Sequence, residues 1–103
     1  MNLLTIILIS FVALEHLYFL ILELFFWTKP KGIKTFGIKS KEFAEETRVL
    51  AANQGLYNGF LAAGLVYSII LDNVNFAVFF LICVTIAGIY GSYSTKQIKL
   101  FYI

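Results

Sequence analysis

Three ionisable side chains lie inside the hydrophobic run that covers residues 3–27 of this sequence. Glu15 and His16 are adjacent near the middle of the run, and Glu23 follows seven positions after His16. Each residue of a helix turns by about 100°, so His16 and Glu23 share one face while Glu15 points sideways. A carboxyl group beside an imidazole is suited to relaying protons or to acid–base chemistry.

A second polar group lies in the next hydrophobic run. Asn53, Gln54 and Asn58 stand among small and apolar residues there. The depth of each side chain follows from a rise of about 1.5 Å per residue, with the inner ends of the two runs taken as level. Glu23 then lies near the depth of Asn53 and Gln54. His16 lies near the depth of Asn58.

These depths predict one polar pocket inside a membrane, which would bind or pass a proton, a small solute or a lipid-like ligand. Charged residues at mid-bilayer cost about 3 kcal/mol on insertion scales, so they face protein or a cavity. A plainer role stays open for the amides, since interhelical hydrogen bonds of about 1 kcal/mol hold helices together. The predicted lining residues are Glu15, His16, Glu23, Asn53, Gln54 and Asn58.

Two other functions stay open for the same residues. A membrane-embedded isomerase or epimerase would use Glu15 or Glu23 as its base and His16 as the partner acid. A non-catalytic assembly subunit would use the polar residues only to hold helices together. A closed pocket sized for a substrate would favour the enzyme, whereas a fully packed interior and a stoichiometric partner would favour the assembly subunit.

The apolar residues around these side chains predict an all-α protein. Of the 103 residues, 60% are hydrophobic and 14% are charged, against roughly 25% charged in soluble domains. Runs of about 20 apolar residues cross a bilayer as helices, so we expect a transmembrane bundle of three helices in a single membrane domain, residues 1–103. The expected helices cover about residues 3–27, 41–71 and 74–95, with a cytoplasmic loop at 28–40.

The basic residues orient this bundle. Six of the eight Lys and Arg residues lie in the loop 28–48, and Lys96 and Lys99 follow the third run. Short basic loops stay on the cytoplasmic side, so we expect this loop and the C-terminus inside the cell membrane, and the N-terminus and the turn at 72–75 outside. Within the loop, we expect irregular chain in which Pro30 ends the first helix. We expect Ser40 to cap the second helix.

Small residues predict how the helices pack. Helices in lipid approach each other through side chains that let the backbones come close. The second run has four such residues at a spacing of four, and the third run has two. The predicted packing residues are Ala51, Gly55, Gly59, Ala63, Ala87 and Gly91. Three helices enclose little volume, so we also expect a homo-oligomer.

The composition disfavours other classes of protein. One His and one Cys, Cys83, are too few for a structural zinc site or for a bis-histidine haem in one chain. A Glu–His site on a lone metal ion stays an open alternative. No glycine-rich phosphate loop and no nucleophile signature is present. We therefore expect no metal and no cofactor. The basic loop accounts for the net charge of +2, so the expected partners are the lipid bilayer and further copies of the chain, not nucleic acid.

Several segments carry the pattern of a known family. They are VALEHLY at 12–18, WTKP at 27–30, LAANQGLYNGFLAAG at 50–64 and AGIYG at 87–91. With these segments the chain resembles the bacterial membrane proteins grouped as domain of unknown function 1304. The resemblance implies a small multi-helix membrane protein without an established activity, although some members carry an epimerase label. It also implies a short fourth hydrophobic segment, about where this sequence stops at residues 101–103, so either the chain is naturally short or its end is missing.

Overall fold

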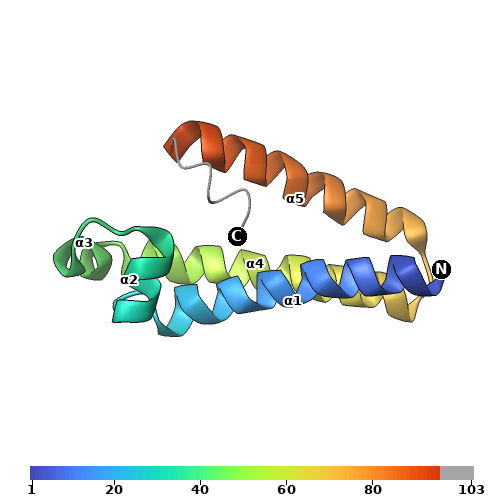
Figure 1. Ribbon diagram of the computed structural model, residues 1–103, viewed down its shortest axis with the longest axis horizontal. Helices are drawn as coiled ribbons and strands as arrows, with labels where there is room; N and C mark the ends of the chain where they lie inside the picture. Colours follow the sequence, from blue (N-terminus) through green and yellow to red (C-terminus); the bar gives the residue numbers. More distant parts are fainter. Residues whose placement is uncertain (96–103) are drawn as a thin grey trace. The chain divides into compact units, whose positions relative to one another are not determined.

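Helices are the only regular secondary structure over residues 1–95, the part that the computed structural model describes. The predicted fold class, all-α, is confirmed. The basic residues at 96 and 99 and the expected start of a fourth segment at 101–103 lie outside the described residues. The helices in chain order are α1 (Leu3–Phe25), α2 (Pro30–Phe36), α3 (Lys41–Glu46), α4 (Arg48–Ile70) and α5 (Val74–Thr95), as Figure 1 shows.

Two of these helices are long and apolar enough to cross a membrane. They are α1 and the stretch Val74–Ser94 of α5. Of the 23 residues of α1, 16 are Leu, Ile, Phe or Val, and a helix of this length extends about 35 Å. The helix α4 is equally long at 23 residues, but its first half carries the amides at positions 53, 54 and 58 and two glycines.

Residues 1–13 and 63–95 belong to one compact unit, unit 1. The first part of α1 packs there against the second part of α4 and the start of α5. The buried core consists of Ile9, Ala13, Leu65 and Ala77. Two of these four residues are alanines, which let the helix segments approach closely at those positions.

The turn between α4 and α5 also lies in unit 1. Asp72 has a φ of 51°, and the side chain of Asn73 caps α5 by accepting hydrogen bonds from the backbone N–H groups of Asn75 (3.0 Å) and Phe76 (3.3 Å). The Met1 ammonium group forms an ion pair with the Asp72 carboxylate. The start of α1 and the end of α4 therefore lie side by side.

We expect Gly64→Ala to destabilise unit 1. A Cβ at Gly64 would lie 2.5–2.8 Å from three ring atoms of Phe80, closer than real Cβ contacts. Overpacking of this kind lowers the free energy of unfolding by about 1–3 kcal/mol. Thermal unfolding in detergent, followed by circular dichroism, measures the loss, and adding Phe80→Leu should restore most of it. The control is Gly91→Ala, because a Cβ there meets nothing within 4 Å. Equal stability of both alanine variants would contradict the prediction.

Residues 14–62 form the second compact unit, unit 2. The segment 28–40, expected to be irregular, contains the helix α2. Pro30 occupies its first turn, where the missing N–H is not needed, and Gly37 ends it in the left-handed conformation with φ 63°. Pro30 therefore starts a helix, whereas α1 has already ended at Phe25. The hydroxyl of Ser40 accepts a hydrogen bond from the Phe43 N–H at 3.0 Å, which confirms the predicted cap at the start of α3.

The expected second helix, 41–71, is divided between α3 and α4. Thr47 separates them with a φ of −102° and a ψ of 8°. Its hydroxyl donates a hydrogen bond to the carbonyl of Phe43 at 2.8 Å. A threonine side chain that bonds back to the preceding turn often bends a helix, and at Thr47 this bond coincides with the break.

Only part of the row of small residues on α4 lies in the contact with α1. Ala51 and Gly55 are buried and Gly59 is half-buried, but Ala63 is exposed. A spacing of four overshoots the helical repeat by about 40° per step, so the row rotates away from the contact. Ala62 takes the buried position instead. On α5, Ala87 is exposed, and Gly91 has open space beside its Cα.

Candidate functional site

A carboxylate and an amide meet between α1 and α4 in unit 2. The side-chain nitrogen of Asn58 donates a hydrogen bond to Oε1 of Glu23, with 2.5 Å between the two atoms. The Glu23 side chain is only 8% exposed. Gly55 makes this approach possible, because a Cβ there would lie 3.1 Å from the Cβ of Glu23. Glu23 and Asn58, with Gly55 beneath them, form what we call the carboxyl–amide site.

The partner of Glu23 differs from the predicted one. From their depths in the two runs, Glu23 was expected beside Asn53 and Gln54, and Asn58 beside His16. In the structure Gly55 faces Glu23 and Gly59 faces Leu20, so the two helices are offset from the expected register by about four residues, or roughly 6 Å.

A polar contact joins the two helices at their inner ends. Trp27, just beyond the end of α1, donates a hydrogen bond from Nε1 to the hydroxyl oxygen of Thr47 at 3.0 Å. Thr47 comes directly before α4, so this contact joins the end of α1 to the start of α4. The offset at Gly55 and Gly59 places the start of α4 about one turn beyond the end of α1, so the two inner ends are not level as expected.

Asn53 and Gln54 are exposed and lie outside the carboxyl–amide site. Their positions around α4 account for this. Asn58 lies about 60° from Gly55, the point of closest approach, whereas Gln54 lies about 100° and Asn53 about 160° away. Only the amide nearest the contact reaches Glu23.

His16 and Glu23 lie on the same buried face of α1. His16 is 7% exposed and its ring packs edge-on against Phe19, with 5.5 Å between the ring centres. Ala13, three residues before His16, is also buried on this face. Glu15 is half-buried and is rotated from this face by about 100°. The structure therefore groups His16 with Glu23 on one surface and leaves Glu15 beside it.

Trp27 and Thr47 form a polar contact that was not predicted from the sequence. Besides donating the hydrogen bond to Thr47, Trp27 packs its ring against Phe36 of α2 with 5.2 Å between ring centres. A partly buried indole N–H usually finds an acceptor, so a single Trp at the end of an apolar run is itself a signal for such a contact.

Sequence comparison places the chain among known proteins. The profile of the family described as "Protein of unknown function (DUF1304)" matches residues 10–103. The chain belongs to this family. It is 32% identical over 100 residues to "Uncharacterized protein YpaA" of Lactococcus lactis subsp. lactis (strain IL1403), which covers 94% of this chain and 84% of the relative. No solved structure matches the chain significantly.

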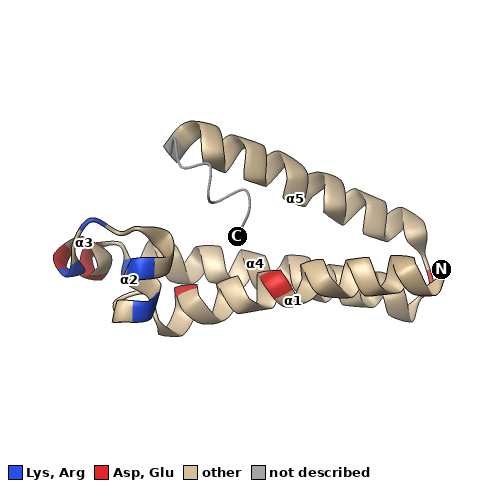
Figure 2. Cartoon of the chain, viewed as in Figure 1, with Lys and Arg blue, Asp and Glu red and all other residues tan. Residues whose placement is uncertain are grey.

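In this member of the DUF1304 family, the basic residues gather around α2 and α3, as Figure 2 shows. The acidic residues of unit 2 lie on α1 and α3. All six Lys and Arg side chains from Lys29 to Arg48 are exposed. The carboxyl–amide site is thus distinct from the basic side chains, because Glu23 is buried and they are exposed.

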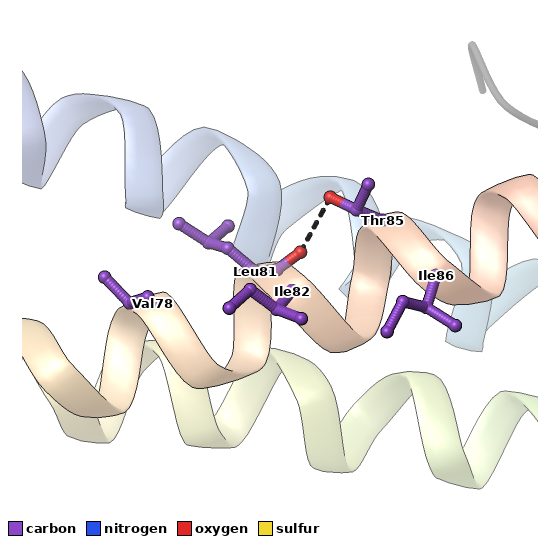
Figure 3. Close-up of a pocket in the computed structure, with 5 residues that line it drawn as sticks. All are labelled: Val78, Leu81, Ile82, Thr85 and Ile86. Atoms are coloured by element: carbon purple, nitrogen blue, oxygen red, sulfur yellow. Dashed lines mark hydrogen bonds between the residues drawn. The ribbon is translucent and has the colours of Figure 1, made fainter.

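A shallow apolar depression of about 280 Å³ lies on α5 of this DUF1304 protein (Figure 3). The hydroxyl of Thr85 donates to the carbonyl of Leu81 at 2.8 Å, so its polar group is satisfied within the helix. None of the predicted pocket residues lines the depression. Across residues 1–95, no three His, Cys, Asp or Glu side chains come together as metal ligands. The lining residues are Val78, Leu81, Ile82, Thr85 and Ile86.

Proposed function

We propose that the chain is a multi-pass integral membrane protein with three crossings, α1, α4 and α5. The length and apolar composition of α1 and α5 support insertion. The N-terminus is outside and the loop 28–48 is cytoplasmic, as the position of the basic residues favours. The contact between Met1 and Asp72 supports this arrangement, since a protein with three crossings needs the start of α1 and the α4–α5 turn on one side.

The register of α4 also fits the proposed membrane. Asn53 and Gln54 lie level with the inner end of α1, where headgroup water satisfies exposed amides. Glu23 and Asn58 lie deeper and satisfy each other. Homo-oligomerisation belongs to the same proposal and is measured by native mass spectrometry of the gently solubilised protein.

Within this membrane protein, the face of α1 with His16 and Glu23 forms an intramembrane polar site that binds or passes a proton; a small solute or a lipid-like ligand is the alternative cargo. One observation carries this proposal: the buried Glu23 carboxyl group accepts a hydrogen bond from Asn58 of another helix. Ionisable residues are expensive inside a membrane, and apolar packing joins helices without them. A carboxyl group with a neutral partner holds and releases a proton without an ion pair to break.

The test is proton exchange in reconstituted vesicles. The wild-type protein should show a pH-dependent carboxyl band in difference infrared spectra and proton flux reported by a trapped pH-sensitive dye. Glu23→Gln should lose both signals, because the amide keeps the shape and a hydrogen-bonding oxygen but cannot titrate. The control is Glu42→Gln, which alters an exposed residue of α3. A Glu23→Gln variant that kept the band and the flux would overturn the proposal.

A further inference from the structure

The segment from Lys29 to Lys39 concentrates positive charge on a folded element. It contains four Lys residues and no acidic residue. All four are exposed, and none of them forms an ion pair with any described residue. The three Glu residues nearby lie on α3 and are exposed as well. We call this segment, α2 with its flanking lysines, the basic arm.

Contacts with the end of α1 hold the basic arm in place. Its Phe36 packs against Trp27, and the backbone of the buried Gly32 lies directly on the carbonyl group of Phe26. Lys31 extends over the ring of Tyr18 on α1, with Nζ 5.9 Å from the ring centre. Long Lys side chains that lie along aromatic surface keep their charged ends accessible. The arm thus presents its charges from a defined position.

We propose that the basic arm is a docking surface for the headgroups of anionic phospholipids. The inference rests on the membrane insertion proposed above and concerns a surface distinct from the carboxyl–amide site. Clusters of four or more Lys and Arg residues next to a membrane helix attract anionic lipids. Trp27 at the base of the arm belongs to the aromatic residues that favour the interface. Charge and position together favour a lipid headgroup over a soluble anion.

The test is native mass spectrometry of the full chain in detergent, with phosphatidylglycerol and phosphatidylcholine added in equal amounts. The wild-type protein should retain phosphatidylglycerol preferentially. Lys29→Gln combined with Lys34→Gln removes two cations that attract anionic headgroups. The double variant should therefore lower that preference by about tenfold or more. The cation–π contacts of the arm are made by Lys31 and Lys39, so both substitutions leave these contacts in place. The matched control, Glu42→Gln with Glu45→Gln, should not lower it.

Three results would overturn the inference. They are equal retention of the two lipids by the wild-type protein, an unchanged preference in the lysine variant, and displacement of phosphatidylglycerol by millimolar glycerol phosphate, which would indicate a site for a soluble anion. Alkaline extraction of native membranes checks insertion separately. A protein that resists extraction but shows no lipid preference refutes the docking surface alone, whereas an extracted protein refutes the membrane proposal.

Discussion

Replacing Gly32 with alanine is expected to destabilise unit 2 by about 3 kcal/mol, the upper range for overpacking. A Cβ at this position would lie 2.0 Å from the carbonyl oxygen of Phe26 and 2.7 Å from its carbonyl carbon. Helix propensity alone predicts the opposite, a gain of about 1 kcal/mol for alanine within a helix. The backbone collision outweighs this gain, because the Phe26 carbonyl already accepts the Lys29 N–H at 3.0 Å and cannot move freely.

Denaturant unfolding followed by tryptophan fluorescence measures this effect. Trp27 is the only tryptophan, and its Cα lies 3.1 Å from the added carbon, so the probe reports on the site itself. Gly37→Ala should cause a smaller loss of stability and serves as the comparison. The left-handed conformation of Gly37 costs a non-glycine residue about 1–2 kcal/mol. A Gly32→Ala variant at least as stable as the wild-type protein would show that α2 does not pack on Phe26.

Replacing Asn58 with leucine is expected to lower the free energy of unfolding by about 1–3 kcal/mol. The change keeps much of the side-chain volume but removes the donor to Glu23, and a buried group that loses its partner costs about this much. The same fluorescence measurement applies, because Trp27 lies at the end of the helix that carries Glu23.

Gln54→Leu is the matched control for Asn58→Leu. It removes the same functional group from the same helix at an exposed position, and we expect a change within about 0.5 kcal/mol. Glu23→Gln should lose less stability than Asn58→Leu, because glutamine retains an acceptor for the Asn58 amide. Equal losses in Asn58→Leu and Gln54→Leu would mean that the carboxyl–amide contact contributes nothing specific.

Much of the helical architecture was predictable because it depends on local chemistry. The apolar runs define α1 and α5, Ser40 caps α3, and the polar turn at 72–75 separates α4 from α5. The helix α2 was not predictable in the same way. Pro30 and Gly37 mark breaks in a sequence, and here they mark the start and end of a helix of seven residues. The packing of Gly32 against Phe26, next to the end of α1, favours the short helix over irregular chain.

The site was partly predictable. The seven-residue spacing of His16 and Glu23 places both on one buried face of α1 whatever its neighbours are. The partner of Glu23 depends on how far α4 is shifted along α1, and this offset appears only in the close approach of Gly55 to Glu23 and of Gly59 to Leu20. The depths expected from the sequence therefore favoured Asn53 and Gln54 as partners of Glu23 and placed Asn58 beside His16 instead. Only Asn58 is oriented toward the carboxyl group.

The separation of Glu23 and Asn58 along the chain has a consequence for biosynthesis. The two residues are 35 positions apart, so at about 5–20 residues per second Asn58 emerges about 2–7 s after Glu23. In the proposed membrane protein, the first helix enters the bilayer during that interval with Glu23 lacking this partner. Its 16 Leu, Ile, Phe and Val residues contribute roughly −5 to −10 kcal/mol on the insertion scale, comparable to or larger than the cost of two acidic side chains at about 3 kcal/mol each. The composition of α1 thus favours its insertion before α4 is made, and the arrival of α4 completes the site afterwards.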